Sequence, residues 1–483
     1  MNNHQEFACA DGTAAPKRAV RGRAAAFALL GAAAVWMAAA CTIAGESEGD
    51  APKPARKPTP GVVLSAFSVS AGGDNLISPR FASNIMDYTA AVPGYDYTGG
   101  ADFVISAAAA AGFSVVMTDW DGGPEGGADL GDEDPSSVEI TGGVPCAPIP
   151  AVLGEKILKK VTVSNADGTK KSVYTITLWN KTMAQGGEIT FDGATHDEIH
   201  TFEYKPAADT GGQTAYTFTV NEDCGGDGEL LIVAGGGAGG DINNETGNWA
   251  AGGGAGGVIY YGRPPVDSPA NFTRAGESFT FLPEIAYAVK AGKGGVNTTA
   301  GWSGGAGVNS EFGPAGETLT AYGGGGGGGN LGSGVHTGGE GGSGGGSWIV
   351  AAAGPAKNVT PRQGNPSGAA GSAKATGGGG AGASSPAAAA IGDGMAGNGG
   401  AGVTLGISGA PKGYGGGGAT GAGGGNSSYN VPSKHGTASH GGGATKYDGA
   451  AGTGGGGAGA TGTSDNGHAG GSGVVIVRLP FSL

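Results

Sequence analysis

Glycine occurs in blocks between residues 235 and 473, and these blocks constrain the fold more than any other feature of the sequence. They include Gly235–Gly237, Gly252–Gly254, Gly323–Gly329, Gly377–Gly380, Gly415–Gly418 and Gly454–Gly457. Glycine loses the most backbone entropy on folding and has no side chain to bury, so such a composition is usual for a flexible linker. However, two apolar, strand-like segments, Glu229–Ala234 and Gly473–Leu479, flank the blocks. A linker needs no matched pair of flanking strands, so we expect the glycine blocks to be ordered.

Two ordered structures can accommodate so much glycine. Collagen requires glycine at every third position and abundant proline, but the run Gly323–Gly329 breaks that register. Polyglycine II helices have three residues per turn and no internal hydrogen bonds, so their N–H and C=O groups must pair with neighbouring helices. Each such bond contributes only about 0.5–1.5 kcal/mol. We therefore expect polyglycine II segments in a bundle that is stabilised by the number of its hydrogen bonds.

Three segments at the start of this part, Tyr216–Val220, Leu230–Gly240 and Gly252–Tyr260, follow one another in a strand-then-glycine order. Together with the closing segment Gly470–Val477, they resemble the glycine-rich surface domain of bacteria and phages. The resemblance covers roughly residues 186–483. It implies a β-framework with glycine-rich excursions, as found in surface, tail-fibre and adhesion-related proteins. The proline-containing stretch 263–275 departs from this pattern and is interpreted as an insertion.

The first forty residues have the organisation of a secretion signal. Basic residues between Lys17 and Arg23 precede an apolar run, residues 24–40, which ends in small residues directly before Cys41. This order resembles a bacterial lipobox, and the resemblance implies that Cys41 carries a lipid. Ala38 stands where that pattern usually has leucine, so an ordinary cleaved signal or an uncleaved anchor stays an alternative. Residues 41–60 are rich in proline and lysine and are predicted to form an extended linker.

The net charge of -14 and the pI of about 4.9 make the chain acidic. No basic stripe or basic helical face is present in the sequence, so we expect no nucleic-acid partner. An acidic surface with dispersed charges suits an extracytoplasmic protein. With the signal and the lipobox-like cysteine, we expect a lipid-anchored protein of the cell envelope, at the outer membrane or the cell surface.

Short strand patterns with regular turns fill residues 61–180. The clearest is a hairpin in which Lys160–Val163 and Ser172–Leu178 flank a turn containing Asp167 and Gly168. Several such strands predict a β-sandwich. The turn and the segment Tyr174–Thr177 that follows it resemble the bacterial cadherin-like domain. This resemblance implies an Ig-like spacer module with no enzymatic residues.

The predicted fold class is therefore all-β after an N-terminal signal helix. The β-sandwich of residues 61–180 is followed by a glycine-rich domain, residues 186–483, which contains the polyglycine II segments. Its framework is predicted to begin with the strands Glu188–Phe191 and Ile199–Phe202. No helix of useful length is predicted after Ala40.

Three glycine motifs match catalytic or cofactor signatures through composition. Residues 235–240 satisfy the dinucleotide pattern G-x-G-x-x-G, and residues 301–305 and 341–345 satisfy G-x-S-x-G. The first requires a helix that opens toward the phosphates, and the second requires a strand-to-helix turn with an oriented histidine and acid. Neither context is predicted, so we expect no cofactor and no catalytic residue.

Carboxylates cluster in one loop of the predicted sandwich. The strongest candidates for cation ligands there are Asp119, Asp121, Asp132 and Asp134. Clustered oxygens suit Ca²⁺, but the spacing is not that of an EF-hand, so a solvated acidic loop is favoured over a metal site.

Two cysteines besides Cys41 lie in the predicted mature part, Cys146 and Cys224. An oxidising compartment would permit a disulfide between them. Because they fall in different predicted domains, two free or buried thiols are favoured.

Aromatic residues recur between the glycine blocks and are candidates for ligand contacts or for a cover over the bundle. The candidate ligand-binding residues are Trp302, Tyr322, Tyr414, Tyr429 and Tyr447. Together these features predict a non-catalytic, lipid-anchored surface protein that presents a glycine-rich domain for adhesion or for recognition of a surface glycan or protein. A purely structural envelope lipoprotein and a surface enzyme that acts on glycans stay open as alternatives.

Overall fold

The computed structural model describes residues 61–72, 74–119, 138–140, 144–222, 224–242, 250–267, 269, 271–297, 303–329, 337–348, 354–368, 380–387, 396–420, 435–461 and 466–480. The predicted signal helix, Cys41 and the proline-rich linker lie outside these ranges. Within them the structure is all-β, with several mostly antiparallel sheets and one short 3₁₀ helix, η1 (Pro206–Ala208). No helix in the described ranges is long and apolar enough to cross a membrane.

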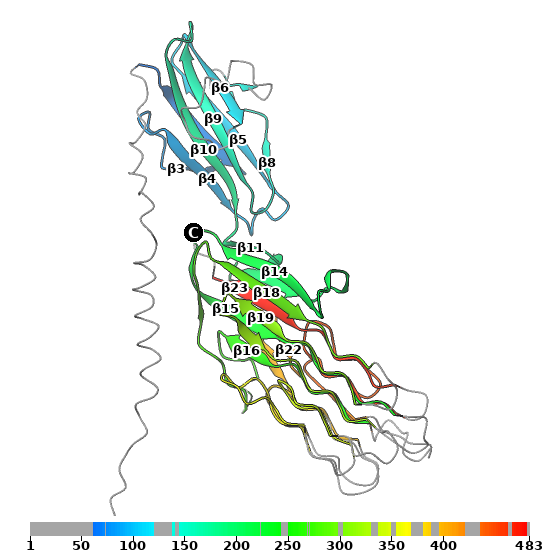
Figure 1. Cartoon of the computed structure of the whole chain (residues 1–483). Coiled ribbons are helices and arrows are strands. Elements are labelled where there is room, and N and C mark those ends of the chain that lie inside the picture. The colour runs from blue at the N-terminus through cyan, green and yellow to red at the C-terminus, as the bar shows by residue number, and fades with distance from the viewer. Residues whose placement is uncertain are drawn as a thin grey trace, which may run out of the picture. The chain divides into compact units, whose positions relative to one another are not determined.

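Two sheets in the order β2-β1-β5-β8 and β3-β4-β10-β9-β6-β7 form the predicted β-sandwich (Figure 1). The strands are β1 (Leu64–Ala71), β2 (Asp74–Asn75), β3 (Ile77–Ser78), β4 (Asp87–Pro93), β5 (Ala101–Ala109), β6 (Phe113–Asp119), β7 (Val138–Glu139), β8 (Ile149–Ala151), β9 (Lys156–Asn165) and β10 (Lys171–Lys181). Alternate residues of the long strands, such as Phe103 and Ile176, are buried in one shared core. The predicted hairpin is confirmed, because β9 and β10 pair with Val163 opposite Ser172, and Gly168 in the turn has a φ of +68°.

The sandwich has a core of its own, drawn from residues between Val62 and Leu178. We therefore expect a fragment of residues 61–181, which ends with β10, to be soluble and to fold without the rest of the chain. It should give a β-type circular dichroism spectrum and one cooperative thermal transition. A disordered spectrum would show instead that the sandwich needs the chain that follows it.

The C-terminal region, residues 184–480, is built on two further sheets in the order β11-β14-β18-β19-β20 and β12-β13-β23-β15-β16, with β17 paired to β15 and a separate hairpin of β21 and β22. The strands are β11 (Ala184–Gln185), β12 (Glu188–Phe191), β13 (Glu198–Glu203), β14 (Gln213–Val220), β15 (Gly226–Val233), β16 (Val258–Tyr261), β17 (Phe279–Phe281), β18 (Ala286–Gly292), β19 (Ser310–Gly313), β20 (Leu319–Ala321), β21 (Val403–Leu405), β22 (Lys412–Tyr414) and β23 (Val474–Leu479). A hydrophobic cluster that includes Phe218 and Ile232 unites the two sheets. A second cluster, on the opposite face of the sheet that contains β15 and β23, unites Leu231 with Val403 and Tyr414 of the hairpin.

The two strands that flank the glycine blocks lie side by side, as the sequence predicts. β15 and β23 pair antiparallel, with Val233 opposite Val474 and Leu230 opposite Val477. β23 also pairs with β13, so the strand that follows all of the glycine blocks fills the middle of its sheet. The glycine-rich segments therefore leave and re-enter one common framework.

The glycine-rich segments continue from the strands as long extended traces that run side by side (Figure 1). We call these segments, between residues 234 and 473, the glycine bundle. In residues 235–240 the N–H groups donate, in order, to the carbonyls of Val308, Gly471, Gly254, Gly305, His468 and Ala251. The first and fourth donors thus reach one neighbouring segment, the second and fifth another, and the third and sixth a third.

The carbonyls of the same segment repeat this pattern toward other neighbours. Gly235 and Ala238 accept from Gly324 and Gly327, whereas Gly237 and Gly240 accept from Gly457 and Ala460; Gly236 accepts from Gly295. A repeat of three residues, with each direction facing a different neighbour, is the repeat of a polyglycine II helix. In the described ranges, the prediction that the glycine blocks are ordered and not a flexible linker is confirmed.

Close approach of the backbones explains why these positions are glycine. A Cβ atom placed on Gly326 would lie 1.7 Å from the carbonyl oxygen of Gly304, and one placed on Gly236 would lie 2.1 Å from that of Gly455. In both cases the obstacle is backbone, which cannot turn aside as the end of a side chain can. Most of the buried alanines and glycines of the bundle stabilise it through backbone hydrogen bonds. They do not build a conventional core of packed side chains.

Cys146 and Cys224 are buried and form no disulfide with each other, as predicted. Cys146 is part of the sandwich core, and Cys224 is part of the cluster between the two C-terminal sheets. The backbone N–H of Ile105 lies 3.2 Å from the Cys146 sulfur, to which it donates.

Candidate functional site

The glycine bundle has an outer end, remote from the sheets, at which several of the glycine-rich excursions reach a common level. Gly240 donates to Ala251, Ala251 to Gly328, and Gly328 to Gly346, while Ala460 donates to Gly240. Each of these residues lies close in sequence to a stretch outside the described ranges. The backbone hydrogen bonds thus hold the bases of these stretches together on one end of a rigid bundle.

A small apolar cluster and one tryptophan belong to this outer end. Ile242, Ala250 and Ala460 pack together and are almost fully buried. Trp348, two residues after Gly346, is 7% exposed, and its Nε1–H has no hydrogen-bond partner among the described residues. Trp348 therefore covers the bundle. Its apolar sequence neighbours, Ile349 and Val350, favour the same covering role.

The aromatic residues predicted as ligand contacts occupy different environments. Tyr447 is 68% exposed. Tyr414, the last residue of β22, is fully buried between the hairpin and the sheet and is not available to a ligand. Tyr322 is half-buried directly after β20, with the ammonium group of Lys357 5.0 Å from its ring centroid. Trp302 and Tyr429 lie outside the described residues.

A cluster of charged side chains, which we call the Arg478 cluster, lies near the C-terminal end of β23, the central strand of its sheet. Arg478 stands opposite Ile199 of β13 and opposite Glu229 of β15. Its neighbours on the same strand face, Val474 and Ile476, are buried beside the β21–β22 hairpin. The alternation of the strand therefore directs this one cation onto the buried face, where it needs partners.

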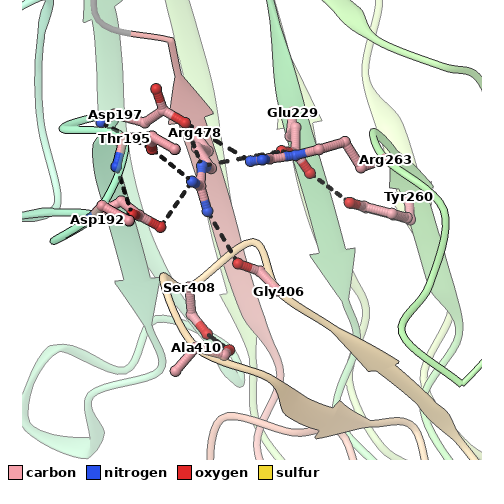
Figure 2. Close-up of polar contacts among 11 residues, drawn as sticks. Asp192, Thr195, Asp197, Glu229, Tyr260, Arg263, Gly406, Ser408, Ala410 and Arg478 are labelled. Atoms are coloured by element: carbon pink, nitrogen blue, oxygen red, sulfur yellow. Dashed lines mark hydrogen bonds and ion pairs between the residues drawn. The ribbon is translucent and has the colours of Figure 1, made fainter.

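Arg478 finds those partners on three sides (Figure 2). Its Nη2 lies 2.8 Å from Asp192 Oδ2, its Nε lies 2.9 Å from Asp197 Oδ2, and its Nη1 lies 3.0 Å from the carbonyl oxygen of Gly406. Only 4% of Arg478 is exposed. Glu229 lies at 4.0 Å, so the guanidinium connects the turn before β13 with β15 and with the hairpin.

Comparison with known protein families places this architecture. The family model described as a glycine-rich domain matches residues 208–480 of the chain. The chain belongs to this glycine-rich domain family. A search of curated proteins gave no match. The matched range contains the whole glycine bundle and its outer end.

The hairpin of β12 and β13 lies before the matched residues in sequence. It nevertheless belongs to the same sheet as β23 and β15 of the matched domain. β13 pairs with β23, and the turn between β12 and β13 supplies Asp192 and Asp197 to Arg478. The Arg478 cluster therefore ties this hairpin to the glycine-rich domain. It was not foreseen from the sequence, although Glu229 and Arg478 are each the one charged residue of the apolar segment that contains it.

Glu229 continues the Arg478 cluster toward β16 in the glycine-rich domain. Its Oε2 accepts a hydrogen bond of 2.5 Å from the Tyr260 hydroxyl, and its Oε1 accepts one of 2.5 Å from Arg263 Nε. Burial, and then the hydrogen bond to Glu229, raise the pKa of Tyr260 far above its ordinary value. Tyr260 thus stays a hydrogen-bond donor to Glu229. The geometry of the Arg478 cluster is that of a structural connection, in which ion pairs and hydrogen bonds join neighbouring strands.

Asp192 should make the glycine-rich domain sensitive to acid. Hydrogen bonds from the backbone N–H groups of Ala194 and Thr195, and then the charge of Arg478, lower the pKa of Asp192 from 3.8 to about 2. A carboxylate with a lower pKa in the folded state contributes stability above its unfolded pKa and loses it as the pH falls through the folded one. We expect the free energy of unfolding of the wild type to fall between about pH 4 and pH 2, and that of Asp192→Asn to fall less. Guanidinium titrations over this pH range would measure it, and identical pH profiles would contradict it.

Two of the three glycine motifs lack the context that their chemistry requires, and residues 301–302 of the third lie outside the described ranges. Residues 235–240 lie inside the bundle and open no helix. Ser343, in the second G-x-S-x-G motif, is fully buried between glycine segments. Of the acidic candidates, Asp119 is exposed and pairs with Lys159, while Asp121, Asp132 and Asp134 lie outside the described ranges. No group of three potential ligands suitable for a metal ion occurs among the described residues.

Three side chains form a row that superficially matches a nucleophile, a base and an acid. Ser439 Oγ lies 2.7 Å from His440 Nδ1, and His440 Nε2 lies 3.2 Å from Asp267 Oδ2. A nucleophile elbow needs a strand-to-helix turn, but Ser439 lies exposed in a turn of the glycine-rich domain. We interpret the row as a tie that fixes the insertion containing Asp267 to the turn at His440, whose φ is +52°.

Proposed function

We propose that this protein is anchored to the cell envelope by a lipid on Cys41 and presents the outer end of the glycine bundle at the cell surface for adhesion or recognition. In this proposal it has no catalytic role. The observation that carries it is the bundle itself, because a hydrogen-bonded scaffold holds several excursions at one level without using their side chains. Side chains at that level are then free to take part in binding.

The rest of the chain suits such a presentation. The proline-rich residues 41–60 would act as an extended spacer above the membrane. The β-sandwich, which we propose to be cadherin-like, would be a second spacer. In the described part of the chain the strongest polar cluster, around Arg478, is locked by mutual ion pairs, which favours a structural role for it.

Cys41→Ala should abolish lipid attachment. The basic, apolar, small-residue and cysteine order from Lys17 to Cys41 is the basis of this expectation. Labelling of growing cells with a radioactive fatty acid should mark the wild type and not the variant. A Cys146→Ala variant is the matched control, because that thiol is buried in the sandwich and should leave labelling unchanged. Equal labelling of wild type and Cys41→Ala would refute the anchor.

Recognition can be distinguished from a purely structural role in the envelope. Protease or antibody access on intact cells tests surface exposure. Binding of the purified full-length protein to immobilised surface glycans and to whole cells tests recognition. We expect Trp302→Ala and Tyr447→Ala, alone or together, to weaken that binding while the thermal melt is unchanged. A protein that is exposed but binds neither target would support the structural alternative.

A further inference from the structure

The insertion between β16 and β17 forms a hollow on the surface of the glycine-rich domain. The hollow has a volume of about 460 Å³. Its lining includes the apolar residues Pro265, Pro269 and Phe272 and the polar residues Thr273, Arg274 and Glu277. This volume lies in the range of about 300–1,000 Å³ that is usual for small-molecule sites.

Backbone contacts hold the insertion in place at both ends. The N–H of Ala275 donates to the carbonyl of Tyr260 at 2.7 Å, and the N–H of Val266 donates to that of Thr404 at 3.0 Å. Arg274 Nη1 donates to the carbonyl of Gly262 at 2.5 Å. Because these ties connect the insertion to β16 and β21, the hollow is shaped before any ligand arrives.

Phe272 supplies an apolar surface that is partly open to solvent. Its ring is half-buried and packs against the cluster under the β21–β22 hairpin, which fixes its orientation. A fixed aromatic ring in a hollow that two prolines also line suits a flat ligand with one apolar face.

The polar residues of the lining favour a neutral ligand with many hydroxyl groups. Arg274 uses one N–H for Gly262 and has further donors, Glu277 is exposed and accepts hydrogen bonds, and Thr273 can do both. The positive charge of Arg274 and the negative charge of Glu277 balance each other, so neither an anion nor a cation is favoured overall.

We propose that this hollow binds a pyranose ring of a neutral glycan, with the C–H face of the sugar on Phe272 and its hydroxyl groups on Arg274, Glu277 and Thr273. This inference rests on the proposed recognition role but assigns the sugar to the insertion and not to the outer end of the bundle. Glu277 also lines a second hollow of about 260 Å³, together with Arg263 and Asp227. A second sugar unit could therefore continue into it, so oligosaccharides should bind more tightly than monosaccharides.

Saturation-transfer NMR with the full-length protein in a sugar-free detergent tests the proposal. The probes are the neutral methyl pyranosides of glucose, galactose, mannose and N-acetylglucosamine. We expect at least one of them to receive saturation, strongest at the C–H protons of one ring face. Phe272→Ala should weaken binding about tenfold and Glu277→Gln by roughly threefold to tenfold, whereas Phe272→Trp should retain it.

Leu282→Ala is the matched control, because Leu282 is 55% exposed and lies outside both hollows. It should bind as the wild type does. The proposal is overturned if none of the four pyranosides receives saturation, if Phe272→Ala and Glu277→Gln both bind like the wild type, or if only a cationic probe such as oligolysine binds. Loss of surface exposure on cells would refute the proposed function and leave this result standing, so the two can fail separately.

Discussion

The Gly326→Val variant is expected to melt well below the wild type and to lose protease resistance in the glycine bundle. The added side chain would place Cβ 1.7 Å from the Gly304 carbonyl oxygen, and that neighbour is itself backbone held by hydrogen bonds. Overpacking of this kind costs about 3 kcal/mol, which corresponds to a decrease in Tm of roughly 6–12 °C for a domain of this size. Differential scanning calorimetry and limited proteolysis would measure the two effects.

Gly193→Val provides the matched control, because Gly193 is exposed, a Cβ atom there meets nothing within 4 Å and the backbone needs no positive φ. It should melt within about 1 °C of the wild type, since a change at an exposed site is usually worth less than 0.5 kcal/mol. Rapid cleavage throughout the bundle in the wild type would mean that it is not packed in solution. Equal melting of both variants would contradict the steric argument.

Arg478→Met should destabilise the glycine-rich domain by about 3–5 kcal/mol, because it leaves a group of buried carboxylates without their central cation. Asp192 and Asp197 both accept hydrogen bonds from the same guanidinium, and their side chains are 11% and 13% exposed. Arg478→Lys should fall between this variant and the wild type, because an ammonium group keeps the charge but not the planar fork that reaches three partners. Guanidinium titration would measure the free energy of unfolding of each variant.

Lys159→Met is a suitable comparison in the β-sandwich. It removes the cation from the pair with Asp119, whose side chain is 61% exposed. An exposed pair contributes less than about 1 kcal/mol, so this variant should be almost as stable as the wild type. A similar loss in Arg478→Met and Lys159→Met would show that burial of the Arg478 cluster has no energetic consequence.

The strands and the order of the glycine blocks could be predicted because their signals are local. Val163 and Ser172 lie close together in sequence on either side of a turn, and apolar β-branched residues mark Leu230–Val233 and Val474–Val477 as strands. The length of the glycine runs excludes collagen by itself. These predictions needed no knowledge of which strands lie next to each other in space.

The Arg478 cluster and the burial of Tyr414 were less predictable, because both depend on which strands lie next to each other. Arg478 meets Asp192 because β23 inserts beside β13, and nothing local in the segment Val474–Leu479 indicates that neighbour. Tyr414 is buried because the three-residue strand β22 covers the sheet, but Lys412–Tyr414 has no strand periodicity of its own. Long-range pairing thus decided both the charged cluster and the burial of this aromatic ring.

The position of β23 also sets an order of events for the folding of the chain. β13 and β15 have no direct pairing and are joined only through β23, so this sheet cannot close until the chain after all of the glycine blocks is available. Pairing of Val233 with Val474 closes a very long loop, and such non-local contacts slow folding. Glycine segments that bond to the last stretch, as Gly236 does to Gly471 and Gly239 to His468, cannot do so before that stretch is available. During synthesis the sheet that contains β23 should therefore stay incomplete until its last strand emerges, and its two halves should then join in one late step.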